Sequence, residues 1–396
     1  MRGLFNEHKF LERYLLLFIC CIASNAIAQP LTNIEDIEGN QNRTGANLDR
    51  QSSHWTLSVE AIALTRGSNT DQKLVNQVGG AESFLNTINP NRSIPLLNSN
   101  QLRYGYGVGP KITLSFHDSS DYVYEAVYFN ALNINASQTV GANGNWLTMY
   151  APGFWQTQDY ANQGMSWTST TGLNSAEASA KQKLSQDFSW ITGLRWIRLK
   201  DSLTGSVTPP DIYFPAWKFG ASPVLSCGSA PPGGNPTFQG IMDCGNVQSS
   251  TPKYFSNFWS ANVLNDLLGV QVGGQGVFLR IGQLSLEGSL KVGLYNNYSS
   301  QNTSVSLAKT MYMASASSSQ LAYSGDGLIQ LKYQIAQDIK LKLGYQVLWI
   351  NQIALAAGQV SKSSSSQTPA GLTANGVNAN SSILFQGGTI GLEYVF

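Results

Sequence analysis

Residues 339–350 read IKLKLGYQVLWI, a stretch in which two lysines are threaded between large apolar side chains. Successive side chains of a β-strand point to opposite faces. The apolar face would hold Ile339, Leu341, Leu343, Tyr345, Val347 and Trp349. The opposite face would hold Lys340, Lys342, Gly344 and Gln346, so one face suits hydrocarbon and the other suits water. A soluble half-buried sheet and a membrane β-barrel both fit this pattern, and the rest of the chain must decide between them.

The composition leaves little surface meant for water. Charged residues make up 12% of the 396 residues, about half the usual share, while aromatic residues reach 11%. After the first thirty residues, no apolar run approaches the 18 or more residues of a membrane helix. The sequence therefore excludes a helical membrane protein.

The amino end has the pattern of a secretory signal peptide. Three basic residues precede a short apolar run at residues 14–23, and small residues of the kind that signal peptidase reads follow it. The pattern predicts that residues 1–28 are a signal peptide for Sec export, cleaved after Ala28. Residues 29–53 are polar without an apolar period, which predicts a flexible segment.

The chain without residues 1–28 is neutral and keeps two cysteines. The leader holds three of the 24 basic and two of the 23 acidic residues, which leaves 21 of each. A neutral chain has no basic field for nucleic acid, so we expect no such partner. Cys227 and Cys244 lie in a turn-rich segment, and in an oxidising compartment we expect them to form one disulfide. Because His and Cys partners are not nearby, we expect neither a metal nor a cofactor.

Period-two alternation of apolar side chains recurs in ten runs between residue 54 and the carboxyl end. Each run has about the nine to eleven residues that a tilted membrane strand needs. Links of a few residues alternate with long links rich in Ser, Asn, Gly, Gln and Thr. The long links are expected around residues 67–101, 137–171, 203–263, 298–320 and 355–382. Bacterial outer-membrane barrels alternate their links in this way, whereas a soluble sandwich has no reason to do so.

We therefore predict an all-β fold over residues 54–396: a single transmembrane antiparallel up-and-down β-barrel of about ten strands, with twelve as the alternative count. Periplasmic turns would be short and outer loops long, with an expanded outer loop at about residues 203–263. A soluble β-sandwich is the second choice. The last strand closes on Phe396 after Tyr394, which resembles the signal read by the barrel-assembly machinery of the bacterial outer membrane; an ordinary edge strand is the alternative.

Several strand segments resemble one known family. They include GYGVGPKITLSF, WITGLRWIRLKDSL, LEGSLKVGLYNN and GGTIGLEYVF, and they resemble, in order, the recurring blocks of the seventh-group β-barrel porin family of planctomycete-type outer-membrane proteins. The resemblance runs from about residue 55 to the end and is weakest in residues 203–263. It implies an outer-membrane barrel of the porin class, but strand patterns carry little information about what passes through.

The period-two register predicts a charged interior of six acids and seven bases. The expected lumen-lining residues are Glu60, Lys111, Glu125, Glu177, Lys181, Arg195, Glu287, Lys291, Asp326, Lys332, Lys340, Lys342 and Glu393. As channel lining, they would form a narrow, weakly selective passive pore for ions or small solutes. As structure, they would pair across the lumen and plug it. Eight-stranded barrels are filled by side chains and wide pores need about sixteen strands, so ten leaves both interpretations open.

The two functional hypotheses are thus a porin-like channel and a non-conducting barrel whose outer loops bind a partner at the cell surface. An enzyme is not expected. Barrel enzymes of the outer membrane carry a histidine at the outer rim, but the only histidines after residue 28 are His54 and His117, both predicted at the periplasmic rim. No Gly-Xaa-Ser-Xaa-Gly elbow or P-loop occurs. The oligomeric state is left open.

Aromatic residues near the ends of the expected strands fit an outer-membrane barrel as well. Interfacial girdles on the lipid-facing side are expected from Tyr104, Tyr106, Trp190, Trp196, Tyr345, Trp349 and Tyr394. A further aromatic group at residues 213–219 could bind a partner or fold into the lumen.

Overall fold

The computed structural model describes residues 53–68, 70–78, 94–119, 121–141, 146–149, 159–161, 164–208, 211–213, 253–255, 258–307, 310–361, 363–365, 372–374 and 376–396. Within these ranges the regular elements are β-strands and two short 3-10 helices, η2 (Ser99–Gln101) and η5 (Ala357–Ser361). A helix long and apolar enough to cross a bilayer does not occur in the described ranges. The predicted signal peptide with Ala28, and both Cys227 and Cys244, lie outside the described residues.

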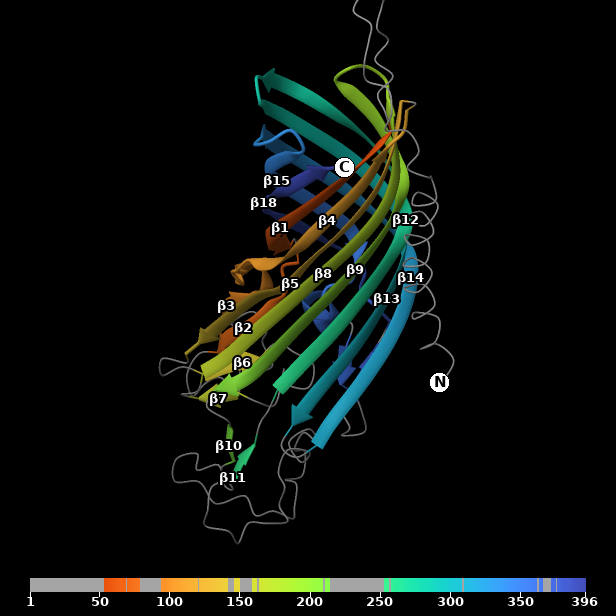
Figure 1. Cartoon of the computed structure of the whole chain (residues 1–396). Coiled ribbons are helices and arrows are strands. Elements are labelled where there is room, and N and C mark those ends of the chain that lie inside the picture. The colour runs from red at the N-terminus through yellow and green to blue at the C-terminus, as the bar shows by residue number, and fades with distance from the viewer. Residues whose placement is uncertain are drawn as a thin grey trace, which may run out of the picture. The chain divides into compact units, whose positions relative to one another are not determined.

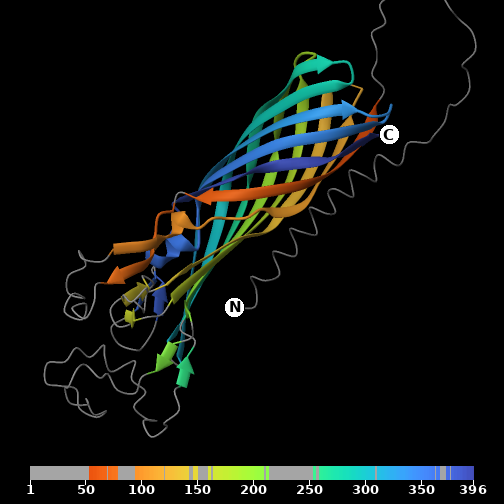
Figure 2. The same ribbon diagram turned by 90° about the vertical axis from the view of Figure 1, so that its left-hand side faces the viewer.

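Ten antiparallel strands close into a barrel in the order β1-β18-β15-β14-β13-β12-β9-β8-β5-β4 (Figures 1 and 2). Every neighbour in the ring is the next barrel strand along the chain, and the first and last strands pair to close it. The barrel strands are β1 (His54–Ser68), β4 (Gly107–His117), β5 (Tyr122–Val140), β8 (Gly164–Lys183), β9 (Phe188–Thr208), β12 (Phe258–Ile281), β13 (Leu284–Leu307), β14 (Thr310–Gln334), β15 (Ile339–Ile353) and β18 (Ser381–Val395). The prediction of a ten-stranded up-and-down barrel is confirmed, and the sandwich is wrong.

Short turns join the strands at one end of the barrel, which we call the turn end; the opposite end is the loop end. In the turn between β12 and β13, Gly282 has a φ of 56°, the left-handed conformation that a tight two-residue hairpin requires. Smaller sheets form in the links of the loop end (Figure 2). They are a four-stranded sheet of β2 (Lys73–Val78), β3 (Ile94–Asn98), β6 (Trp146–Met149) and β7 (Asp159–Ala161), and the pairs β10 (Asp211–Tyr213) with β11 (Lys253–Phe255) and β16 (Ser363–Ser365) with β17 (Leu372–Ala374).

The strands differ in length far more than the sequence analysis predicted. β12, β13 and β14 hold 24, 24 and 25 residues, whereas β1, β15 and β18 hold 15 each. The long link expected at residues 298–320 is therefore wrong, because β13 runs to Leu307 and β14 begins at Thr310. The expected loop at 203–263 is shorter for the same reason, with β9 ending at Thr208 and β12 starting at Phe258. The Ser- and Asn-rich composition resembled a loop although these residues pair as strands.

The pattern of exposure inverts along these long strands. In the half of β13 near the turn end, Leu290 and Val292 are 65% and 53% exposed and point outward, while Lys291 between them points inward. Nearer the loop end, Val305 is 1% exposed and Asn302 on the opposite face is exposed. We call these parts the turn half and the loop half of the barrel. The turn half has an apolar outer face, and the loop half has a polar one.

An apolar core fills the inside of the loop half. Trp167 and Trp259 on the wall are fully buried with ring centroids 5.8 Å apart, and a Cβ at Gly205 would lie 2.6 Å from the Trp167 ring. Side chains of the four-stranded sheet, including Leu74 and Leu147, belong to the same core. The loop half is thus built like a soluble protein, with a small sheet packed on the inner face of the wall.

Candidate functional site

The thirteen charged residues expected in the lumen lie inside the turn half, and twelve of them form ion pairs. The bonds run between strands: Lys342 to Glu60 (3.0 Å) and Glu393 (3.4 Å), Lys340 to Glu393 (3.4 Å), Lys332 to Glu287 (2.9 Å) and Glu393 (3.8 Å), Lys181 to Glu125 (2.7 Å), Lys291 to Glu177 (2.8 Å), and Arg195 to Asp326 (2.7 Å). The remaining base, Lys111, is 6% exposed and donates a 3.5 Å hydrogen bond to the Gln346 side chain.

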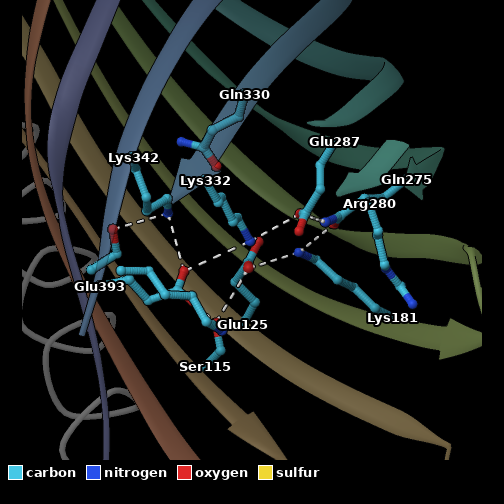
Figure 3. Close-up of polar contacts among 12 residues, drawn as sticks. Ser115, Glu125, Lys181, Gln275, Arg280, Glu287, Gln330, Lys332, Lys342 and Glu393 are labelled. Carbon is cyan, nitrogen blue, oxygen red and sulfur yellow. Dashed lines mark hydrogen bonds and ion pairs between the residues drawn. The ribbon is translucent and has the colours of Figure 1, made fainter. Parts of the chain in front are cut away.

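Eight of these residues form one connected network near the turn end, part of which Figure 3 shows, whereas the Lys291–Glu177 and Arg195–Asp326 pairs stand apart from it. Glu393 accepts bonds from three lysines, and neutral side chains extend the network, as Gln275 does by bonding both Lys181 and Glu287. Exposure falls with depth: the Lys340 side chain is 33% exposed, Lys332 is 17% and Arg195 is 1%. The lumen therefore begins as a partly wetted charged vestibule and becomes dry further in.

An apolar layer follows the charged network toward the loop half. Nine of the ten barrel strands each contribute a side chain that is no more than 3% exposed, and these side chains pack as one cluster. They are Ile62, Phe129, Leu173, Ile197, Leu267, Tyr295, Ala322, Leu348 and Phe385. Because water touches so little of these side chains, they form a dry apolar layer among the described residues.

The last residue of β15 and the first part of the β15–β18 link, residues 353–360, also lie inside the barrel, and we call this stretch the inward segment. All eight of its residues are buried. Asn265 of β12 bonds both the carbonyl (2.7 Å) and the amide (2.8 Å) of Ala354, and Asp201 of β9 accepts from the amide of Ala356 (2.8 Å). Side chains of the wall thus satisfy the backbone of the inward segment, as a loop buried inside a protein requires.

A second buried charge pair supports this contact. Arg66 of β1 bonds both Asp201 and Thr171, and its guanidinium lies 4.2 Å from the centre of the Tyr104 ring. Tyr104 also accepts a bond from Arg66 (2.9 Å) and donates one to Ser169 (3.0 Å). The prediction that Tyr104 belongs to an outward aromatic girdle is therefore wrong, because its hydroxyl is hydrogen-bonded to Arg66 and Ser169 inside the barrel.

The sequence analysis missed this second polar group. Arg66 and Asp201 stand at the edges of segments that were interpreted as loops, so their inward direction was not considered. A usable signal exists in β13, where Asn297, Ser299, Gln301 and Thr303 recur at every second position and are all buried. Such a polar period of two in a loop-like stretch is itself typical of a strand.

The remaining predicted residues lie at the turn end. His54 and His117 pair across β1 and β4, with stacked rings 4.3 Å apart. Tyr394 and Phe396 stack at 5.9 Å, and the Phe396 backbone exchanges two 2.9 Å bonds with Trp55. Among the described residues, no group of three or more His, Cys, Asp or Glu side chains is arranged to hold a metal ion.

Comparison with known proteins shows similarity only to solved structures. No family model matches the chain, so the resemblance to the seventh-group porin family gains no support, and no curated protein matches it either. The chain is similar to the outer membrane protease OmpT from Escherichia coli, with 12% identity, coverage of 87% of this chain and 97% of that one, and a TM-score of 0.45.

Two further similarities are weaker. The translocator domain of the autotransporter NalP from Neisseria meningitidis has 10% identity, 85% and 88% coverage, and a TM-score of 0.34. A Pseudomonas aeruginosa FadL homologue has 10% identity, 87% and 90% coverage, and a TM-score of 0.30. The first of the three is named as an outer-membrane protein, but TM-scores below 0.5 carry no argument about this chain's function.

Proposed function

We propose that the protein is an outer-membrane β-barrel that is closed to ions in the form described here, and that it holds its loop half at the cell surface. The apolar layer carries this proposal, because tightly packed side chains from nine strands leave no wetted passage among the described residues. The buried inward segment adds a second closure. The proposal involves no catalysis, since both histidines of the barrel lie at the turn end.

The membrane location is supported by the outer face of the turn half. On β13 this face is apolar from Leu284 to Leu294, about the length that a tilted membrane strand needs. Exposed apolar side chains continue around the ring, for example Val270, Ile329 and Leu343 at 54–59% exposure. A surface of this kind is unfavourable in water and favourable in a bilayer.

The proposal includes the export route of the protein and its partners in the membrane. Sec export, cleavage after Ala28 and a periplasmic turn end rest on the sequence pattern. Outer-membrane lipid would surround the turn half, and the barrel-assembly machinery would read the strand that ends in Tyr394 and Phe396. Membership of the seventh-group porin family rests on the strand segments alone.

A narrow porin-like channel for ions or small solutes is the second candidate. The partly wetted vestibule favours it, because Lys340 and Lys332 remain accessible from the turn end. In that case the apolar layer would act as a gate, and the inward segment would have to move for solute to pass.

Planar-bilayer conductance of the refolded mature protein separates the two candidates, once a heat-modifiable gel shift has shown a closed barrel. The closed barrel predicts no current steps. As a matched variant, Asn265→Ala removes both bonds to Ala354 of the inward segment, together with one bond from Asn297, and should also stay silent because the apolar layer remains. Reproducible steps from the unaltered protein would contradict the proposal and favour the channel, and the change in reversal potential of Lys340→Glu or Lys342→Glu would then test the lining.

A further inference from the structure

Charged side chains are almost absent from the outer face of the barrel strands. Among the described strand residues that point outward, the charged ones are Arg198 and Lys200 of β9 and Asp266 of β12. Arg198 and Asp266 are direct cross-strand partners, and Lys200 is the next outward position on β9. Three charges gathered at one place on a face that otherwise carries none call for a physical reason.

The cluster stands where the apolar outer face ends. On the side toward the turn end, the outward neighbours of Arg198 on β9 are Trp196 and Leu194, and the outward neighbour of Asp266 on β12 is Leu268. The next outward residues on β9, toward the loop end, are Lys200 and Ser202. If the turn half spans the bilayer, as the proposed function has it, these charges lie at the level of the lipid headgroups on the loop side.

The local contacts hold one cation in place and leave another exposed. Arg198 Nε and Nη2 bond the two carboxylate oxygens of Asp266 at 2.7 and 3.2 Å, and the guanidinium lies 5.1 Å from the centre of the Trp196 ring. Lys200 is exposed, and its neighbours across the two adjacent strands are Gly172 and Leu264, neither of them acidic. Two cations against one acid leave a net positive charge.

The outer surface beyond the cluster is rich in hydroxyl and amide groups. Thr204 and Ser260 bond each other across β9 and β12 at 3.1 Å, and Thr139 and Ser166 do so across β5 and β8 at 3.0 Å. Asn262 is exposed two positions from Leu264 toward the loop end. Such groups donate and accept hydrogen bonds, which suits sugar hydroxyls better than acyl chains.

We propose that Arg198, Lys200 and the hydroxyl-rich surface beyond them bind a phosphorylated glycolipid of the surrounding leaflet. The phosphate would contact the two cations, the acyl chains would lie along the apolar outer face below, and the sugar would lie against the Ser, Thr and Asn side chains above. Asp266 and Trp196 position Arg198. This inference rests on the proposed membrane location and adds a lipid class to it.

The test is native mass spectrometry of the folded full-length mature barrel in a neutral detergent, titrated with single lipids. The probes are a diphosphorylated glucosamine-disaccharide glycolipid, phosphatidylglycerol and phosphatidylcholine. We expect one glycolipid to bind more tightly than either phospholipid. Lys200→Gln should weaken glycolipid binding about fivefold, the effect of one cation at a lipid surface. Arg198→Gln combined with Asp266→Asn should also weaken it, although the net charge of the site is unchanged.

The matched control is Arg280→Gln combined with Asp187→Asn. This ion pair has a similar 3.1 Å separation but lies at the turn end, with both side chains more than half exposed. It should leave glycolipid binding unchanged, and every variant should keep the gel shift of a folded barrel.

Three outcomes would overturn the inference. Equal binding of phosphatidylglycerol and glycolipid would remove the role of the sugar surface. If Lys200→Gln left the affinity for the glycolipid unchanged, the lipid would bind elsewhere on the barrel, and the proposed membrane location would still stand. A chain that stays in solution and does not enter vesicles would overturn the membrane location and the lipid site together.

Discussion

The turn half and the loop half of the barrel are built from the same strands but are inside-out relative to each other. In the turn half of β9, Trp190 and Leu194 point outward and Arg195 points inward. In the loop half of the same strand, Leu199 and Leu203 point inward and Lys200 points outward. The β9–β12 register has no shift, so the same alternate positions point outward in both halves. The two halves therefore differ only in which residue types occupy the inward and outward positions.

In the proposed membrane location, the medium around each half of a strand explains this difference. A strand in a bilayer needs an apolar outer face, and its polar residues can only go inside. A strand standing in water hides its apolar residues instead, and here the four-stranded sheet and the inward segment cover them. Three substitutions test this contrast, in order of decreasing effect.

The largest effect is expected inside the turn half, where charges are buried. Arg195→Ala leaves Asp326 without its ion-pair partner at 3% exposure and should lower the free energy of unfolding by about 3–5 kcal/mol. Urea unfolding of the refolded barrel, followed by tryptophan fluorescence, measures the loss. As a control, Arg195→Met combined with Asp326→Leu removes both charges and should cost much less. A double variant as unstable as the single one would mean that packing, not charge, stabilises this region.

A smaller effect is expected on the outer face, where one strand allows both halves to be compared. Leu290→Arg places a charge on the apolar outer face of β13 and should destabilise the barrel in lipid by about 2–4 kcal/mol. Asn302→Arg, on the same face of the same strand but in the loop half, should change stability by about 0.5 kcal/mol or less. Unfolding in vesicles gives both values. Equal costs would mean that the bilayer does not end between these two positions.

The smallest effect is expected at the mouth of the vestibule. Lys340 pairs with Glu393 at 3.4 Å while a third of its side chain is exposed to solvent, and two other lysines also contact Glu393. Lys340→Gln should therefore cost about 1 kcal/mol or less, and the difference should shrink further in high salt. A cost comparable to that of Arg195→Ala would show that the vestibule is far drier than its exposure indicates.

The fold of the turn half could be predicted because one short-range rule governs it. Runs such as residues 339–350 alternate strictly, and the number of runs gave ten strands. Pairing partners could not be predicted in the same way. Glu393 contacts Lys332, Lys340 and Lys342, and only the stagger of β14, β15 and β18 brings the three together.

The loop half was mostly hidden from sequence reasoning, because its outer face carries Ser, Thr and Asn. These residues are common in loops and are also acceptable on a wetted strand, so composition alone favoured loops at residues 298–320. The inward segment was hidden for another reason. Its backbone is satisfied by Asn265 and Asp201, which are far away in the chain.

The sequence by itself determined that the chain forms a closed ring of amphipathic strands, since alternation is a local property of each strand and its length. Tertiary structure alone decided that inward side chains of nine strands pack into one buried apolar layer. That layer depends on which inward side chains reach the same depth, and the depth is set by strand tilt, by stagger and by a link that folds back inside. Tyr104 illustrates the difference: its local pattern suits a girdle at the surface, but Arg66 and Ser169 hold it inside.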